Sequence, residues 1–431
     1  MKRQSSRWIV PFVLAALGFV HHSHAQGIVL PGAGPVNRSM AGAGVAAPLD
    51  AAGAIHWNPA SITGLESSEF LLGAELLCLT THVESSFGPL AGETRSDSGV
   101  SILPTAAVVF QPQDSPWTFG LGMFSIGGFG INLPGSPAAP PTNPILSPTF
   151  TGGPMYSKLA VLQLAPTAAL KITDRLSIGL APTVAIADVA LDPNAFASPD
   201  VAGYPEGTHV RTIWGLGFQA GIYYETENRW HLGASYKSPQ WFEEATSYAT
   251  YANGQPRTDG LKVDYPAIIS LGAAYYGLPR TVWAIDLRYV DYDNAQLFGQ
   301  AAGYGPDGAW TGLGWQSVFA IATGVQYQLT DAWSLRIGYS YNENPIAGAN
   351  TFFNIAAPAI YEHIISVGAS WRITCRTSLV LAYLHAFENS ISGPWVAGPP
   401  NAPAPGVSLP GTAVTTRQSI DCLVAGLQVK F

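Results

Sequence analysis

The sequence predicts an all-β fold, a transmembrane antiparallel β-barrel of about fourteen strands with an N-terminal plug in its lumen. Charged residues make up only 11% of the chain of 431 residues, whereas a soluble domain has roughly a quarter. An export signal opens the chain, yet no later apolar run reaches the roughly 20 residues that a spanning helix needs. Apolar residues also recur at every second position, as in a strand whose two faces meet different surroundings.

Residues 1–25 are predicted to be a cleaved signal peptide. Lys2, Arg3 and Arg7 precede an apolar run at 8–20, and small residues then mark cleavage before Gln26. A membrane anchor is the alternative, but the run is too short to span a bilayer as a helix. We therefore expect export, with the bacterial outer membrane as the destination.

The strands are predicted from strict alternation. In 333–341 the odd positions are Trp, Leu, Ile, Tyr and Tyr, and the even positions are Ser, Arg, Gly and Ser. A helical period would bring Arg336 onto the apolar side. A soluble β-sandwich also alternates, but the low charge and the aromatic residues at the ends of the apolar stripes favour a barrel. The predicted strands are 69–83, 98–111, 116–131, 157–172, 175–190, 210–225, 229–244, 262–276, 280–294, 316–329, 332–342, 361–373, 376–388 and 417–431.

The connections alternate between short turns and long loops, as in bacterial outer-membrane barrels. Residues 173–174 form one short polar turn, whereas 134–154 and 394–410 are long and rich in proline. The barrel is expected to occupy 69–431. Its last strand ends in Phe431, an aromatic terminus of the kind that the outer-membrane assembly machinery is thought to recognise.

Residues 26–68 are predicted to form the plug. The segment is rich in Gly and Ala, which pack closely in a confined space. A disordered periplasmic arm is the alternative, but Ile55, Trp57, Ile62 and Leu65 favour burial.

Several ordered motifs resemble the FadL/TodX family of outer-membrane transporters of long-chain fatty acids and other hydrophobic compounds. The first two, 39–44 (Ser-Met-Ala-Gly-Ala-Gly) and 50–60, lie in the plug, and the second ends in the turn Asn58, Pro59, Ala60. Three more lie in the barrel, at 263–266 (Val-Asp-Tyr-Pro), at 333–341 and at 344–346 (Asn-Pro-Ile). The resemblance covers essentially the whole mature chain, and the proline-rich loops depart from it.

The resemblance implies a fourteen-stranded barrel closed by an N-terminal hatch. It also implies that hydrophobic substrate is captured at extracellular loops, enters the barrel and leaves sideways into the bilayer beside a kinked strand. Such a gap requires broken strand pairing, which glycine or a bulge can produce. We expect Gly127, Gly128 and Gly130 to form this kink, although ordinary glycines at a strand end would give the same sequence.

The capture surface and the head-group site are predicted from residue type. Apolar residues isolated among prolines, Ile145, Leu146 and Phe150, are expected to make first contact with substrate. Inward-facing arginines could bind a carboxylate bidentately, and the candidates are Arg38, Arg288 and Arg336. Structural Arg–Asp pairs in the lumen are the alternative.

Other functions are disfavoured. The sequence has no Gly-x-Ser-x-Gly elbow, no His-Glu-x-x-His and no complete phosphate loop, so we expect no enzyme, cofactor or metal. A pI near 5.5 argues against a nucleic-acid partner. A general diffusion porin is the main alternative, and an outer-membrane lipid hydrolase is a weaker one. We expect a monomer surrounded by outer-membrane lipid, and the sequence leaves open whether Cys375 and Cys422 pair.

Overall fold

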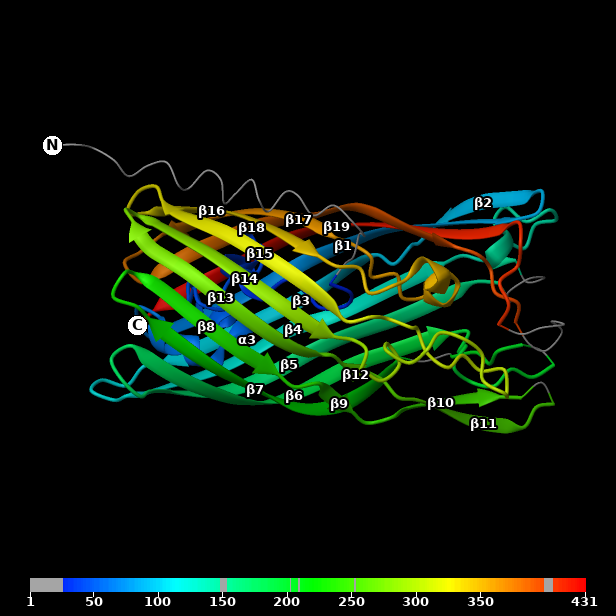
Figure 1. Cartoon of the computed structure of the whole chain (residues 1–431), viewed down its shortest axis with the longest axis horizontal. Helices are drawn as coiled ribbons and strands as arrows, with labels where there is room; N and C mark the ends of the chain where they lie inside the picture. The colour runs from blue at the N-terminus through cyan, green and yellow to red at the C-terminus, as the bar shows by residue number, and fades with distance from the viewer. Residues whose placement is uncertain (1–25, 148–152, 202, 208–209, 252, 399–405) are drawn as a thin grey trace.

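Fourteen antiparallel strands form a closed barrel in the computed structural model, which describes residues 26–147, 153–201, 203–207, 210–251, 253–398 and 406–431. Consecutive strands pair with each other, and β1 pairs with β19 from Glu69↔Lys430 to Phe87↔Thr412, which closes the wall (Figure 1). The wall consists of β1 (Glu69–Phe87), β3 (Val100–Phe110), β4 (Trp117–Leu133), β5 (Met155–Lys171), β6 (Leu176–Asp192), β7 (Arg211–Glu225), β8 (Trp230–Lys237) with β9 (Gln240–Phe242), β12 (Asp264–Tyr265) with β13 (Ala267–Leu278), β14 (Thr281–Asp291), β15 (Val318–Gln328), β16 (Trp333–Asn342), β17 (His363–Arg372), β18 (Thr377–Gly393) and β19 (Thr412–Lys430).

Each of the fourteen predicted strands overlaps one of these, so the predicted fold class is confirmed. The sequence did not predict β2 (Leu90–Arg95), which extends β1 as a hairpin, or the separate hairpin of β10 (Ala245–Thr250) and β11 (Pro256–Leu261). Both hairpins lie among the long loops (Figure 1). Strands outside the lipid need no continuous apolar face, so the alternation that marks membrane strands is weak there.

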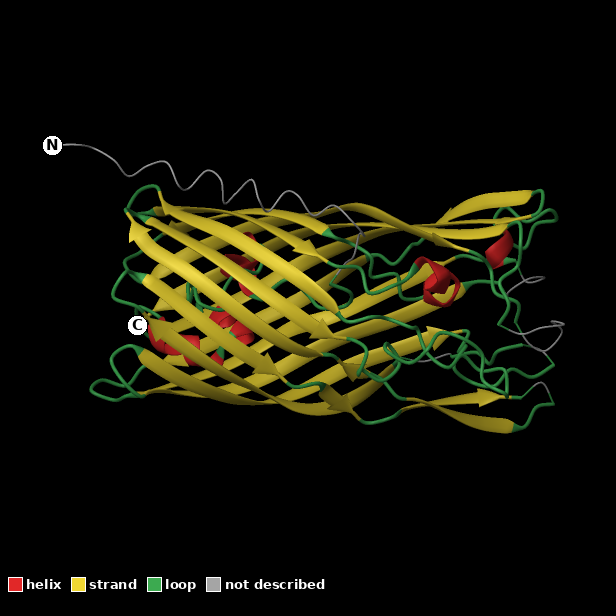
Figure 2. Cartoon of the chain, in the orientation of Figure 1, coloured by secondary structure: helices red, strands yellow, loops and turns green. Residues whose placement is uncertain are grey.

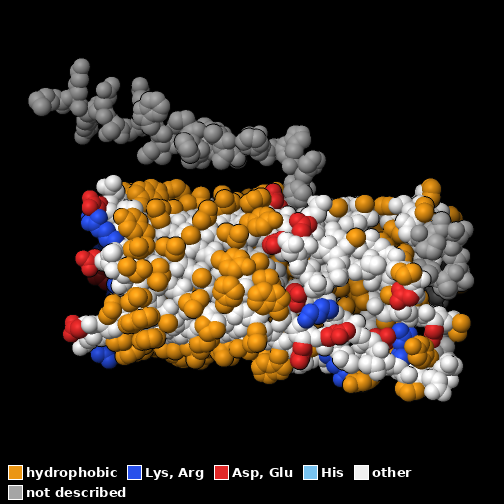
Figure 3. All heavy atoms as spheres, turned by 60° about the horizontal axis from the view of Figure 1, so that its bottom comes forward, with side chains coloured by type: hydrophobic (Ala, Val, Ile, Leu, Met, Phe, Trp, Pro, Cys, Tyr) orange, Lys and Arg blue, Asp and Glu red, His pale blue; other side chains and the backbone are white. Residues whose placement is uncertain are grey.

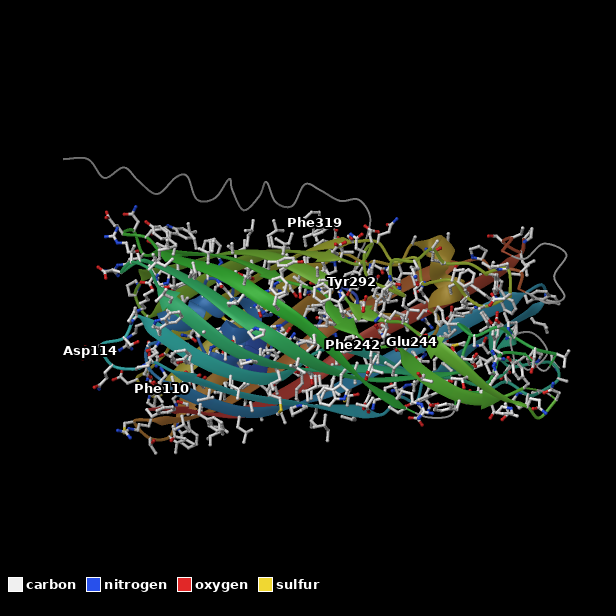
Figure 4. All side chains as sticks on the ribbon, turned by 90° about the horizontal axis from the view of Figure 1, so that it is seen from below. Phe110, Asp114, Phe242, Glu244, Tyr292 and Phe319 are labelled. Atoms are coloured by element: carbon white, nitrogen blue, oxygen red, sulfur yellow. The ribbon has the colours of Figure 1, made fainter. Side chains whose placement is uncertain are left out.

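The two ends of the barrel differ. Short turns close one end, for example between β5 and β6 and between β17 and β18, and the C-terminus lies at this end (Figure 1). The other end carries the long loops, with η2 (Pro144–Leu146) and η3 (Gly348–Asn354) among them. Figure 4 shows Asp114 at the short-turn end and Glu244 towards the loops.

Hydrophobic side chains cover a band of the outer wall next to the short-turn end, and charged side chains flank it on both sides (Figure 3). Aromatic residues mark both margins, with Trp117, Trp333 and Trp371 on the short-turn side and Trp214, Trp241 and Phe319 on the loop side. Aromatic girdles of this kind sit at the two membrane interfaces of outer-membrane barrels. No helix in the described part of the chain is long and apolar enough to cross a bilayer.

The N-terminal segment, residues 26–65, lies inside the barrel, where its short helices are visible through the wall (Figure 2). It comprises α2 (Gly34–Ser39), α3 (Ala51–Trp57) and η1 (Pro59–Gly64), and all its residues except Leu49 and Gly64 are buried. The helices are short because caps and prolines bound them: the Asp50 carboxylate accepts a hydrogen bond from the Gly53 N–H at 3.2 Å, and Pro59 begins η1.

Glycines in the wall allow this segment to lie directly against the strands. A Cβ on Gly338 of β16 would sit 2.3 Å from the Met40 carbonyl carbon, and one on Gly179 of β6 would sit 2.3 Å from the Ala60 nitrogen. The alternating pattern therefore places apolar side chains against lipid on the outer face and glycines, which allow close backbone packing, on the inner face. Cys78, Cys375 and Cys422 are free, with Cys375 exposed and Cys422 buried, so the open question of a Cys375–Cys422 pair is answered in the negative.

Candidate functional site

The pairing of β3 with β4 stops partway along the wall. It runs from Phe110↔Phe119 to Thr105↔Phe124 and goes no further. Beyond that point β3 continues to pair with β1, up to Cys78↔Val100, and β4 continues with β5, down to Leu133↔Met155. The wall is therefore interrupted between Val100–Pro104 on one side and Ser125–Leu133 on the other.

A bulge in β4 marks the start of this interruption. The register between β4 and β5 shifts between Ser125 and Gly127, so one extra residue is inserted there. The backbone groups of the bulge bond to the N-terminal segment instead of to β3: the Gly128 N–H donates to the Ile28 carbonyl at 3.1 Å, and the Leu30 N–H donates to the Ile126 carbonyl at 3.0 Å.

The glycines at the bulge differ in how much they are needed. A Cβ on Gly127 would lie 2.7 Å from the Ile28 carbonyl oxygen, and Gly128 has φ +155 with the Leu159 carbonyl oxygen 2.3 Å from a built Cβ. Both positions therefore require glycine. Gly130 has room, because the nearest atom to its Cβ position is the Ser98 Cβ at 4.0 Å.

A cavity of about 600 Å³ fills the interruption. Its outer lip is formed by Val100 and Ile102, which are 59% and 69% exposed, and Leu30 and Tyr361 line it from the interior side. Most of the other lining side chains are apolar, among them Leu77, Leu79, Leu103, Phe129, Ile131, Leu159, Val161 and Ile420. The cavity thus joins the inside of the barrel to its outer wall through apolar surface.

A second cavity, of about 40 Å³, continues towards the loops. It shares Phe129, Ser157, Lys158 and Leu159 with the first cavity. Its other walls come from the loops and the loop ends of strands: Val189, Ala190, Leu191, Phe196, Leu261, Val263, Leu297, Trp310, Leu313, Phe353, Ala356 and Ala357. The two cavities therefore adjoin each other along a mostly apolar wall between the loops and the interrupted part of the barrel.

Three tyrosines hold the N-terminal segment and the bulge in place. Tyr265 donates to the Ile126 carbonyl at 2.9 Å, and Tyr361 donates to the Val29 carbonyl at 3.0 Å. Tyr292, inside the barrel in Figure 4, donates to the Gln26 carbonyl at 2.7 Å and accepts from the Ile28 N–H at 2.9 Å. This tyrosine clamp (Tyr265, Tyr292, Tyr361) was not predicted, because the three residues are far apart in the chain: Tyr265 ends β12, Tyr292 follows β14 and Tyr361 precedes β17.

The candidate carboxylate-binding arginines bind the protein itself, and none lines either cavity. Arg38 of α2 makes a bidentate pair with Glu75 of β1, with both N–O distances at 2.9 Å and both residues buried. Arg336 donates to Gln326 and Ser370, each at 2.7 Å. Their placement does not support a role in receiving a substrate carboxylate.

Arg288 belongs to a buried network that joins β14 to the N-terminal segment. Its guanidinium lies 2.9 Å from Asp286 and 3.6 Å from the centre of the Trp57 ring. Asp286 also accepts hydrogen bonds from the Gly44 and Val45 N–H groups, at 2.7 and 3.1 Å. The alternative prediction, structural Arg–Asp pairs in the lumen, describes this site.

The predicted turn at Asn58, Pro59 and Ala60 fastens the segment at a second place. The Asn58 carboxamide donates to the Val45 carbonyl at 2.9 Å and to the Ile222 carbonyl of β7 at 3.0 Å, and it accepts from the Ala60 N–H at 3.1 Å. One side chain therefore bonds to two parts of the segment and to the wall, which explains a preference for Asn at this position.

The predicted capture residues are not at the surface. Ile145 and Leu146 are 1% and 0% exposed, within an apolar cluster under the loops that includes Ile131, Phe353 and Trp395. The prediction of an exposed capture surface is therefore wrong for these two residues, because the proline-rich loop folds back and buries its apolar side chains. Phe150 and the predicted signal peptide lie outside the described residues.

The Asp50 carboxyl gives the N-terminal segment a pH dependence that can be measured. Burial, with Glu69 nearby, raises the pKa of Asp50 to about 8, although Arg336 and the Gly53 N–H act in the opposite direction. The folded state therefore favours the protonated form, and stability should fall as pH rises from about 4, the ordinary carboxyl range, to about 8. Asp50→Asn keeps a good helix cap without the charge.

We expect Asp50→Asn to unfold at a higher temperature than the native protein above pH about 8, and at nearly the same temperature at pH about 4 or below, where Asp50 is protonated in both the folded and the unfolded state. Loss of the compact, heat-modifiable band on electrophoresis measures this transition. Asp114→Asn, at the exposed short-turn end, is the matched control and should change neither value. An identical pH dependence in the Asp50 variant and the native protein would contradict the prediction.

A closed, lipid-facing barrel with an occupied lumen and an apolar opening in its wall defines an outer-membrane transport protein. The chain belongs to the OMPP1/FadL/TodX family of outer membrane transport proteins, whose family model matches residues 19–393. The predicted resemblance and the outer-membrane location are confirmed. The matching family and the relatives whose names state a function are transport proteins, in agreement with the prediction that the chain is not an enzyme.

Individual relatives are distant. The long-chain fatty acid transport protein of Salmonella typhi is 21% identical over 400 residues, covering 84% of this chain and 87% of that protein. The 47 kDa outer membrane protein of Pasteurella multocida is 25% identical over 216 residues, which span 43% of this chain and 47%, about half, of the relative.

Two solved structures share the fold. The P. putida toluene transporter TodX has a TM-score of 0.67 at 18% identity and covers 93% of this chain and 99% of its own. A Pseudomonas aeruginosa FadL homologue has a TM-score of 0.68 at 16% identity and covers 94% and 99%. At these identities the likeness establishes the fold alone.

Proposed function

We propose that the protein carries hydrophobic small molecules from the cell exterior into the outer membrane and releases them sideways through the interrupted wall between β3 and β4. The named relatives include a fatty acid transport protein and a toluene transporter. The observation that carries the proposal is the apolar cavity of about 600 Å³ that joins the barrel interior to the lipid face where β3–β4 pairing stops.

Apolar surface explains why such a route works. Moving a hydrophobic molecule through water costs roughly 25 cal/mol for each Å² of apolar surface that stays exposed. A continuous apolar track from the loops to the lipid avoids this cost, and a water-filled pore does not. The route requires no energy source, because the bilayer is the more favourable environment for the cargo.

In this proposal residues 26–68 act as the hatch, and the kink at Gly127 and Gly128 keeps the lateral opening formed. The hatch residues Ile28, Val29 and Leu30 lie against the bulge and are held by the tyrosine clamp. Because Leu30 lines the cavity, its displacement would widen the connection to the interior. Release of these few hydrogen bonds is therefore the expected gating step.

Two further parts of the proposal concern assembly. The exposed aromatic ring of Phe431 follows β19 at the short-turn end, where the assembly machinery could bind it. The barrel is proposed to act as a monomer, since each copy contains its own cavity and its own hatch.

Blocking the opening tests the transport route. Gly130→Trp places a large side chain where the native cavity has room. Uptake of a labelled hydrocarbon by cells should then fall by about an order of magnitude or more, because a hydrocarbon that cannot use the opening must pass through water. Ala106→Trp, on the lipid-facing side of the paired part of β3, is the control and should leave uptake unchanged. Equal uptake by both variants, at equal surface levels of folded protein, would rule out the lateral route.

A further inference from the structure

We infer that the cargo of this transporter is uncharged, and that the route discriminates against carboxylates such as fatty acid anions. This inference rests on the proposed function and deepens it. Four features of the chain carry it: the engagement of the lumen cations, the charge at the cavity, the unpartnered Gln418 oxygen in the cavity wall, and the charge of the loop side.

The four lumen cations are already engaged. In the described part of the lumen the buried cations Arg38, Lys237, Arg288 and Arg336 are matched in number by four buried carboxylates, Asp50, Glu69, Glu75 and Asp286. Lys237 contacts His56 at 3.2 Å and stacks over Trp57, and the arginines are held as described above. A substrate carboxylate would have to displace one of these buried partners, at a cost of several kcal/mol.

The cavities offer little positive charge of their own. Among the described residues that line them, Lys158 is the one Lys or Arg. Its ammonium group lies 3.1 Å from the Asp188 carboxylate, which also accepts a hydrogen bond from Thr212 at 2.9 Å. Asp97 lines the same cavity. The charges at the opening therefore sum to minus one, which disfavours an anion.

Two buried polar atoms at the cavities have no hydrogen-bond partner among the described residues: the Gln418 Oε1 acceptor at the larger cavity and the Trp310 Nε1–H donor at the smaller one. Gln418 lines the cavity and is 3% exposed, and its Oε1 has no hydrogen-bond partner among the described residues. A carbonyl oxygen can accept a hydrogen bond from a neutral hydroxyl, but it repels a carboxylate. Gln418 thus favours an uncharged molecule that carries a donor, such as a hydrophobic alcohol or phenol.

The approach to the cavity is strongly acidic. Between the loop-side edge of the hydrophobic band and the loop tips there are eighteen acidic residues and six basic ones. The acids are Glu84, Glu93, Asp97, Asp188, Asp192, Asp200, Glu206, Glu243, Glu244, Asp259, Asp264, Asp291, Asp293, Asp307, Glu343, Glu362, Glu388 and Asp421, and the bases are Arg95, Lys158, Arg211, Arg257, Lys262 and Arg417. The mature residues outside the described part contain no Lys or Arg. A field of this sign slows the arrival of anions and leaves neutral molecules unaffected.

Binding of a matched pair of ligands tests the inference. Radiolabelled dodecanol and dodecanoate have the same chain and differ in the charge of the head group, and equilibrium binding to the purified protein in detergent compares them near neutral pH. We expect dodecanol to bind at least about tenfold more tightly, which corresponds to about 1.4 kcal/mol of electrostatic penalty on the acid. Equal or tighter binding of dodecanoate would overturn the inference while leaving the proposed function intact.

Charge variants at the opening provide a second arm. Asp188→Asn frees Lys158 and should raise the affinity for dodecanoate several-fold with no change for dodecanol, whereas Lys158→Gln should not raise it. A dodecanoate affinity that is the same in both variants would count against the inference. Binding of neither ligand to any form, in protein that is folded and heat-modifiable, would overturn the proposed function itself and the inference with it.

Discussion

Deleting residues 26–65 from the mature chain is expected to turn a barrel of low ionic conductance into an open channel. A barrel of eight strands is just filled by its own side chains, whereas one of sixteen to eighteen strands leaves an aqueous channel. A barrel of fourteen strands is closer in width to the barrels that leave an aqueous channel. In this protein the N-terminal segment fills the lumen, with nearly all of its residues buried. Unitary current steps in planar bilayers, absent or small before deletion, should become large and steady.

The deletion also separates the hatch from the porin alternative. A general diffusion porin would conduct steadily in its native form, so deletion would add little. The wall should survive the deletion, because its lumen charges, such as Glu75 and Asp286, would be solvated by the water that replaces the segment. Gly338→Leu is a milder second variant, since a side chain there collides with the backbone at Met40. If both variants fold and neither conducts more than the native protein, the segment does not close the lumen.

The wall was predictable because lipid imposes a residue-by-residue rule. Every membrane strand must place apolar side chains outwards at each second position, and segments such as 333–341 show this plainly. The β10–β11 hairpin lies outside the lipid and left no such pattern. The position of the bulge could be predicted as well, since consecutive glycines within a long strand indicate a break in pairing.

Side-chain partners in the lumen could not be predicted. The sequence identifies Arg38, Arg288 and Arg336 as rare inward cations, but it does not reveal that Arg38 meets Glu75 across the gap between α2 and β1. The tyrosine clamp depends in the same way on how β12, the segment after β14 and the segment before β17 come together in the barrel. The sequence shows which charged and polar side chains are available for the lumen. Which of them pair depends on tertiary contacts between segments far apart in the chain.

Ile145 shows the limit of reasoning from composition alone. Apolar residues among prolines predict exposure only if the loop has no core of its own. Here the long loops pack on one another, and Ile145 is buried beside Leu133 and Val414. In the proposed route, the apolar surface that substrate meets first is the wall of the smaller cavity, at residues such as Phe196 and Trp310.

Removal of the Asp286 carboxylate should destabilise the attachment of the hatch more than any other single charge change. Asp286→Ala leaves Arg288 buried without its carboxylate partner and two hatch N–H groups without their acceptor, at an expected cost of about 3–5 kcal/mol. Asp331→Ala, where the aspartate faces solvent beside Arg280, is the matched control at about 0–1 kcal/mol. The urea concentration at which the heat-modifiable band disappears measures both.

The double variant Asp286→Ala/Arg288→Met distinguishes an electrostatic loss from a packing loss. Replacing both members of a buried pair with apolar groups removes the stranded charge, and part of the stability should return. Protease cleavage within residues 41–49 of the folded barrel reports the hatch directly, and it should be fast in Asp286→Ala, slower in the double variant and slowest in the native protein. If the double variant is as unstable as Asp286→Ala, the network holds the hatch through the shape of its side chains and the hydrogen bonds to Gly44 and Val45, and charge pairing contributes little.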